Sequence, residues 1–185
     1  MSSKSPIGNL PLNIVKGKQY LTQTNISYFR TFEKCGYVFD TGQSESNSTY
    51  NSIINNTSTE KYCVFNYNFP TVKIYKCNII NNSVTDKVIY NSYCKLLTVE
   101  ECNIIDNIGT FAFYIEYFGK TEVINCFLRN NDKTSGNFLF NNTYDKEINL
   151  ELKHYWTELC QAKQKYPFLD PDNILRIRGF RHRRW

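Results

Sequence analysis

One segment of this chain recurs three times without gaps, and the repeat constrains the fold more than any other feature. The copies are residues 72–82 (VKIYKCNIINN), 97–107 (LTVEECNIIDN) and 121–131 (TEVINCFLRNN). A fainter copy, residues 50–56 (YNSIINN), precedes them at an offset of 26 residues, and a weak one follows at residues 148–152. The cysteines of the three copies recur with a period of about 25 residues, which indicates stacked copies of one small structural unit.

The apolar residues within each copy follow the period of a β-strand. Val72, Ile74, Cys77 and Ile79 alternate with polar residues, except for one extra residue near Lys76. Alternation with period two predicts a strand with one buried face, and the slip of one residue is what a corner between two strands needs. Each unit also contains a second apolar stretch, at residues 62–65, 88–90, 113–115 and 138–140.

A unit of about 25 residues with three short strands predicts an all-β chain, a parallel β-helix solenoid of about four to five coils over residues 46–152. Helical repeats would need longer apolar runs with period 3.6, and the β-branched, aromatic and Asn residues oppose them. Equivalent positions should stack about 4.8 Å apart. The expected buried ladders are Ile74–Val99–Val123, Cys77–Cys102–Cys126 and Ile79–Ile104–Leu128, and the expected turn ladders are Asn82–Asn107–Asn131 and Asn81–Asp106–Asn130.

On these residues, the chain resembles right-handed parallel β-helix repeat proteins of the pectate-lyase-like (pectin-lyase-like) superfamily. The Cys-Asn/Thr-Ile/Phe-x-Asn-Asn coil is closest to β-helix repeats of protist surface proteins, and the resemblance covers about residues 46–152. It implies a location at the cell surface. The beginning of the chain, however, is polar and has no apolar core of a signal peptide, and no anchor or apolar run long enough to span a membrane is visible.

The two ends of the repeat need caps, because a β-helix exposes strand edges and core there. We expect residues 1–45 to form an N-terminal cap or imperfect first coils. Residues 152–160 carry apolar side chains at helical spacing, so we expect a capping helix at 153–167 that ends at Pro167. A partner-binding role for this helix is the alternative. Residues 168–185 form a basic tail, which is a flexible end, foreign sequence or an anion-binding segment.

The net charge of +5 comes from this tail. Without the tail arginines the chain has 17 basic and 17 acidic residues; these arginines are Arg176, Arg178, Arg181, Arg183 and Arg184. A neutral body argues against a nucleic-acid partner. The seven cysteines include no CxxC pair and the chain has only two histidines, so we expect neither a zinc site nor a cofactor.

Catalysis in β-helix polysaccharide enzymes depends on acids gathered on one face, because hydrolysis uses two carboxylates and a lyase uses a base beside cations. The candidate acids are Asp86, Glu100, Glu101, Asp106, Glu116 and Glu122. No acidic pair recurs on adjacent coils, so we predict no catalytic or metal-binding residues. The cysteine ladder has the phase of the core, where a thiol is inert.

Exterior tyrosines offer a candidate interaction surface, namely Tyr75, Tyr114 and Tyr117. They would stack on sugar rings or receive a protein, although Tyr is also common on β-surfaces for packing alone. The sequence thus predicts a non-catalytic β-helix module for protein or glycan interaction, related to a surface or adhesion role. The alternatives are a polysaccharide lyase or hydrolase, an inactive relative of one, or a basic-tailed anion binder.

Overall fold

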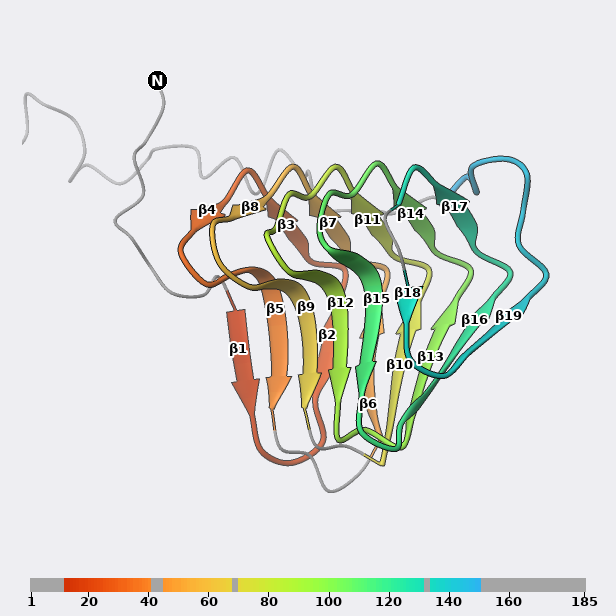
Figure 1. Ribbon diagram of the computed structural model, residues 1–185, viewed down its shortest axis with the longest axis horizontal. Helices are drawn as coiled ribbons and strands as arrows, with labels where there is room; N and C mark the ends of the chain where they lie inside the picture. The colour runs from red at the N-terminus through yellow and green to blue at the C-terminus, as the bar shows by residue number, and fades with distance from the viewer. Residues whose placement is uncertain (1–11, 41–44, 68–69, 132–133, 151–185) are drawn as a thin grey trace, which may run out of the picture. The chain divides into compact units, whose positions relative to one another are not determined.

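The computed structural model describes residues 12–40, 45–67, 70–131 and 134–150. These residues form an all-β parallel solenoid of about five turns, which confirms the parallel β-solenoid predicted from the repeat (Figure 1). The expected capping helix at 153–167 and the basic tail at 168–185 lie outside the described residues.

Three parallel sheets run along the solenoid, and the coils contribute a strand to each of them in turn. Sheet A contains β1 (Leu12–Val15), β5 (Lys34–Asp40), β9 (Tyr62–Tyr67), β12 (Lys87–Ser92), β15 (Phe111–Glu116) and β18 (Thr134–Ser135). Sheet B contains β2 (Tyr20–Thr22), β6 (Ser46–Thr49), β10 (Thr71–Tyr75), β13 (Leu96–Glu100), β16 (Lys120–Ile124) and β19 (Phe138–Asn141). Sheet C contains β3 (Asn25–Ser27), β7 (Ser52–Ile54), β11 (Asn78–Ile80), β14 (Asn103–Ile105) and β17 (Phe127–Arg129), and a small fourth sheet pairs β4 (Arg30–Thr31) with β8 (Thr57–Ser58).

The register of these sheets stacks equivalent positions of the repeat. Ile74 pairs with Val99, and Val99 pairs with Val123. Ile104 lies between Ile79 and Leu128 in sheet C. The side chains of this interior are almost all fully buried, so that the core is a continuous apolar column inside the coils.

Corners between the sheets are made by single residues in the left-handed backbone region. Between sheets B and C, φ lies between 50° and 56° at Gln23, Tyr50, Lys76, Glu101, Asn125 and Asn142. Lys76 is the position where the alternation slips by one residue, so the extra residue is the corner itself. A second row of such residues follows sheet C, at Tyr28, Asn55, Asn81, Asp106 and Asn130, and a third follows sheet A, at Lys16, Tyr93 and Tyr117. Asn and Asp adopt this conformation more readily than most residues, which accounts for their presence after sheet C.

Buried asparagines reinforce the corner after sheet C. The side chain of Asn82 accepts a hydrogen bond from the backbone N–H of Asn56 and donates one to the carbonyl of Ile53, at 3.1 and 2.8 Å. Asn107 repeats both contacts one coil later, and its amide also donates to Asn131. Each amide therefore replaces peptide partners that the turning backbone has lost, as buried polar groups require.

The cysteine column performs the same task after the corner between sheets B and C. The backbone N–H of Cys77 points to the Cys102 sulfur at 3.3 Å, and that of Cys102 points to the Cys126 sulfur at 3.4 Å. In the first coils the acceptor is an amide, because Thr24 donates its N–H to Asn51. Burial raises the pKa of the Cys102 thiol well above its usual value. These thiols are buried packing and hydrogen-bonding groups.

Two assignments at the ends of the repeat differ from the sequence prediction. The repeat predicts that residues 138–140 align with 113–115 in sheet A, but β19 pairs with β16 in sheet B, and β18 occupies the sheet A position. The last coil is shorter than the others, so its apolar residues arrive early. Ile148, expected to begin a weak further copy, lies in no strand.

Residues 12–40 contribute strands to all three sheets, so paired coils begin before residue 46.

Placing a charge in the core tests this phase assignment. Ile104 is fully buried, so Ile104→Asp should lower the free energy of unfolding by about 4 kcal/mol or more, because the carboxylate has no partner there. Lys73 lies on the outside and pairs with Glu100, so Lys73→Asp should cost about 1 kcal/mol. Urea unfolding followed by circular dichroism measures both. Equal losses from the two variants would contradict the assignment.

Candidate functional site

The structure places the three candidate tyrosines in different surroundings. Tyr75 ends β10 in sheet B, next to the corner residue Lys76. Tyr114 lies half-buried in β15 of sheet A, and Tyr117 forms the corner directly after that strand. Tyr114 and Tyr117 thus belong to one region of the surface, whereas Tyr75 belongs to another sheet.

The ring of Tyr75 is occupied by neighbours from its own chain. The ammonium groups of Lys73 and Lys76 lie 4.7 and 5.2 Å from the ring centre, and the ring of Tyr50 packs edge-on at 5.9 Å. Such cation–π and edge-to-face contacts stabilise a β-surface without any ligand. Tyr75 is therefore accounted for by packing.

Tyr114 is part of a tyrosine cage around Lys87. The Lys87 ammonium lies 4.5 Å from the ring centre of Tyr114, 4.9 Å from that of Tyr90 and 5.4 Å from that of Tyr62. It also forms an ion pair with Asp86. Only 14% of the Lys87 side chain is exposed, so the cation is held inside the cage by its own chain.

Glu116 completes the polar contacts beside this cage. It accepts hydrogen bonds from the hydroxyl groups of Tyr90 and Ser92. Burial, and next the bond to Glu116, raise the pKa of Tyr90 far above its usual value. The Tyr90 hydroxyl therefore stays protonated and keeps donating to the carboxylate.

Three exposed aromatic side chains lie together at the corner after sheet A. The rings of Tyr93 and Tyr117 stack at 3.9 Å with an interplanar angle of 22°, and both residues are about half exposed. Phe118 follows and is fully exposed, at 102% of its reference area. We call Tyr93, Tyr117 and Phe118 the corner patch. Exposed apolar groups gathered in this way are typical of interaction sites.

Tyr93 and Phe118 were missed by the sequence analysis. Tyr93 precedes Tyr117 by one repeat, and Tyr90 precedes Tyr114 by the same interval. Aligning the polar and aromatic positions of the repeat, as well as its apolar ones, would have placed Tyr93 beside Tyr117. Phe118 has no aromatic counterpart one coil earlier, where Cys94 stands, so the repeat carries no signal for it.

The six candidate acids all have partners among the described residues. Five form ion pairs: Asp86 with Lys87, Glu100 with Lys73, Glu101 with Lys76, Asp106 with Arg129, and Glu122 with Lys120. The sixth is Glu116, bound by Tyr90 and Ser92. A lyase or hydrolase needs acids aimed at a substrate. These carboxylates are instead aimed at neighbouring side chains of the solenoid.

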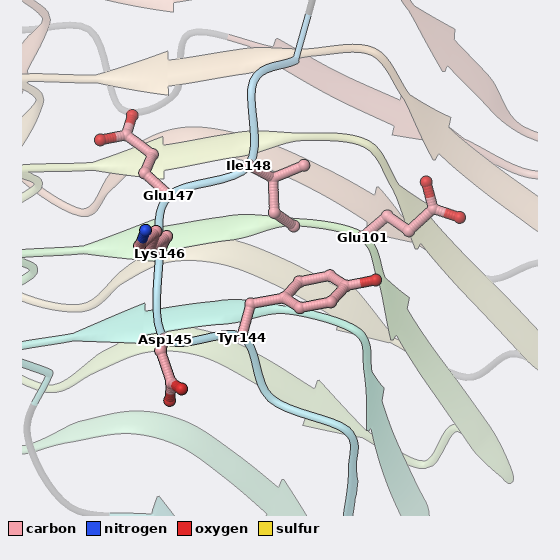
Figure 2. Close-up of a pocket in the computed structure, with 6 residues that line it drawn as sticks. All are labelled: Glu101, Tyr144, Asp145, Lys146, Glu147 and Ile148. Atoms are coloured by element: carbon pink, nitrogen blue, oxygen red, sulfur yellow. The ribbon is translucent and has the colours of Figure 1, made fainter.

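A hollow of about 490 Å³ lies between the corner residue Glu101 and residues 144–148, which we call the return segment (Figure 2). The backbone N–H of Tyr144 donates to the carbonyl of Cys126, the residue that precedes β17. Ile148 then bonds to the side chain of Asn103 in β14 through both its backbone N–H and its backbone carbonyl, each at 2.8 Å. The Tyr144 ring and Ile148 lie on the side of the hollow that faces Glu101. Glu101 pairs with Lys76 at 3.3 Å, so this carboxylate is already neutralised.

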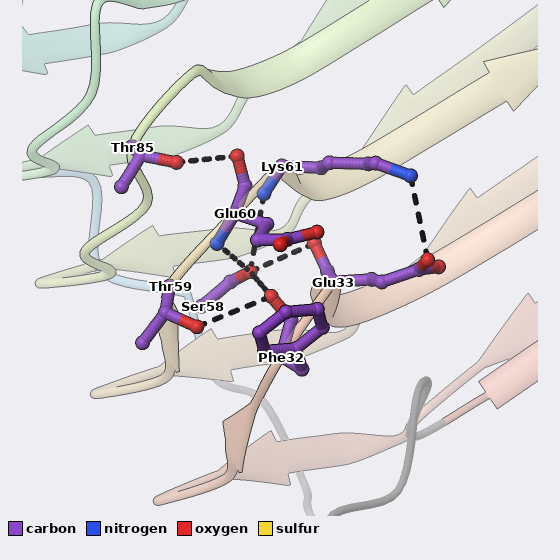
Figure 3. Close-up of polar contacts among 7 residues, drawn as sticks. All are labelled: Phe32, Glu33, Ser58, Thr59, Glu60, Lys61 and Thr85. Carbon is purple, nitrogen blue, oxygen red and sulfur yellow. Dashed lines mark hydrogen bonds and ion pairs between the residues drawn. The ribbon is translucent and has the colours of Figure 1, made fainter.

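Loops after sheet C form a polar cluster around Ser58 (Figure 3). The Ser58 hydroxyl donates to the Glu33 carbonyl at 2.7 Å and accepts from the N–H groups of Glu60 and Lys61 at 3.3 and 3.4 Å. Lys61 also pairs with Glu33. The contacts of the hydroxyl are all with peptide groups and not with a base, so the cluster joins two loops and offers no activated nucleophile.

The described residues contain no group of three His, Cys, Asp or Glu side chains that could hold a metal ion. In the same part of the chain, no helix has the length and apolarity needed to cross a membrane. No protein-family model, no curated protein and no solved structure matches the chain. The function proposed below therefore depends on the fold and the surface alone.

The ion pair between Arg129 and Asp106, at the corner after sheet C, predicts a change in the pKa of Asp106 when Arg129 is replaced. Hydrogen bonds from Arg129 and Asn130 lower the pKa of Asp106 below its usual value of 3.8. Arg129→Gln should therefore raise this pKa, which an NMR titration of the Asp106 carboxyl group would measure. Because the folded-state pKa is lowered, the pair stabilises the fold above the unfolded-state pKa and loses its effect as the pH falls through the folded-state value. An unchanged titration in the variant would contradict the contact.

The tyrosine cage predicts a stability contribution from Lys87. Lys87→Met should lower the free energy of unfolding by about 2 kcal/mol, because the variant loses the largely buried cation–π contacts and leaves Asp86 unpaired. Lys61→Met is the matched control: its ion pair with Glu33 is exposed and should contribute about 0.5 kcal/mol. Chemical denaturation compares the two. Equal losses would show that the cage adds nothing.

Proposed function

We propose that this chain is a non-catalytic binding module and that the corner patch is its contact surface for a protein partner. The observation that carries the proposal is the exposure of Tyr93, Tyr117 and Phe118 at one corner. Aromatic residues in the centre of a contact supply much of the binding energy of protein interfaces. The outer face of sheet A, with Tyr62 and Tyr114, continues this surface along β15 and its neighbours.

A protein is favoured over a glycan by the state of the nearby polar groups. Sugar recognition depends on free donors and acceptors that orient the hydroxyl groups of the ligand. Here the polar groups already have partners: Lys87 and Asp86 form an ion pair with each other, and Glu116 accepts a hydrogen bond from Ser92. The facing sides of the Tyr93 and Tyr117 rings also cover each other, which leaves less ring surface for a sugar. An apolar protein contact needs neither free polar groups nor both faces of each ring.

A polysaccharide lyase or hydrolase is the second class of function implied by the resemblance. The pairing of Glu100, Glu101 and Asp106 with cations argues against it, because a catalytic acid or base must reach the substrate.

We also propose that the solenoid is right-handed and related to the pectate-lyase-like β-helix proteins. The support is general: connections between parallel strands of one sheet are right-handed in nearly all proteins. The Asn ladders, which lie at a corner made by residues with positive φ, agree with the resemblance of the repeat to these proteins. A role at a cell surface, as in the protist repeat proteins, stays part of this proposal.

Variants of the corner patch test the binding role. Tyr117→Ser and Phe118→Asp should each reduce the capture of partner proteins by immobilised full-length chain at least tenfold, by quantitative mass spectrometry. Tyr28→Ser is the matched control, because Tyr28 is another exposed corner tyrosine, 78% exposed, after sheet C. Circular dichroism verifies that each variant is folded.

Two outcomes would contradict the proposal. Capture that is unchanged in both patch variants, or lost equally in Tyr28→Ser, would remove the corner patch as the contact surface. Binding on a glycan array that these variants abolish would replace the protein partner with a glycan.

A further inference from the structure

Two buried asparagines of sheet A lack the partners that other buried asparagines of this solenoid have. Asn66 of β9 and Asn91 of β12 are paired in register, and they are 0% and 1% exposed. The side-chain nitrogen and oxygen atoms of both residues have no hydrogen-bond partner in the structure. The adjacent positions of the same row are Phe39 and Ile115, which are apolar. The two amides are therefore a polar pair between apolar neighbours.

The ladder after sheet C shows what satisfied asparagines look like in this fold. Asn82 and Asn107 each accept a backbone N–H and donate to a backbone carbonyl, at 2.8 to 3.1 Å. They occupy a corner, where the turning backbone leaves peptide groups free. Asn66 and Asn91 occupy the interior of strands, where the peptide groups are already paired between coils. The backbone near them therefore has little to offer their side chains.

We infer that Asn66 and Asn91 form a binding site for internal water. Buried amides without partners are rare in proteins because each would lose its hydrogen bonds to solvent on folding, and four such groups together would cost much of the stability of a domain. Buried water molecules normally satisfy such groups, with two to four hydrogen bonds each.

The chemistry of the pair selects water over an ion. Each amide offers one acceptor oxygen and an NH₂ group with two donors. A cation would use the oxygens and leave both NH₂ groups unpaired, and an anion would do the reverse. Water both donates and accepts, so it serves all four atoms.

NMR of the full-length chain tests the site directly. The side-chain NH₂ protons of Asn66 and Asn91 should show cross-relaxation peaks with water that indicate a bound molecule. The NH₂ groups of Asn82 and Asn107 are internal controls, since they donate to protein carbonyls, and they should show none. A high-resolution crystal structure should show ordered water within hydrogen-bond distance of Asn91. Absence of both signals at Asn66 and Asn91 would overturn the inference.

Substitution provides a second test, with the opposite expectation for the two kinds of asparagine. The double variant Asn66→Leu with Asn91→Leu should expel the water without removing any protein hydrogen bond, so its melting temperature should stay within about 2 °C of the parent or rise. Asn82→Leu should lower it by about 8 °C or more, because that side chain bonds to protein backbone. An equally large fall in the double variant would mean that Asn66 and Asn91 bind protein groups, which would contradict the water site.

Discussion

Hydrogen bonds between the peptide groups of successive coils determine where every side chain of this structure lies. Because all strands are parallel and in register, each residue of a central strand has a fixed counterpart one coil before it and one coil after it. The corners preserve this register with single left-handed residues, such as Lys76 and Glu101, whose own N–H groups also bond to the next coil. Like positions must then tolerate each other at the spacing of neighbouring strands.

The composition of the outer surface follows from this constraint. A row of identical charges would repel along the whole solenoid, and lysines of the described coils instead lie beside acids of the next coil, as with Lys73 beside Glu100 and Lys76 beside Glu101. Amides and aromatic rings can be repeated in a row, because amides hydrogen-bond to one another and rings stack, as the Asn82–Asn107 and Tyr93–Tyr117 contacts illustrate. The pairing of Glu100, Glu101, Asp106 and Glu116 with residues of a neighbouring coil is thus partly a consequence of the stacking, whereas Asp86 and Glu122 pair with lysines of their own coil.

The sequence alone was sufficient for the central coils, because Ile74, Val99 and Val123 recur at intervals of 25 and 24 residues and have one physical role. It was less informative where the interval or the chemistry changed. The first coils have Leu21 and Ser48 in the row of Ile74, and Thr24 and Asn51 stand where later coils have cysteine, so these coils do not align with the repeat. The short last coil places Phe138 in another sheet than its spacing predicts. The aromatic contacts were beyond reach for another reason. The cage around Lys87 depends on the directions of side chains from three coils, which no spacing in the sequence records.

The return segment changes how such a chain can come apart. A solenoid in which each coil touches only its neighbours can unwind one coil at a time from an end. Here Ile148 reaches back over β17 to Asn103 in β14, so the terminal coil is tied to one that it does not adjoin. Fraying at this end cannot proceed past β17 until the two bonds to Asn103 have broken. Two amide hydrogen bonds thereby link the last described residues to a coil that they do not adjoin, so unwinding from this end has to break contacts with more than one coil.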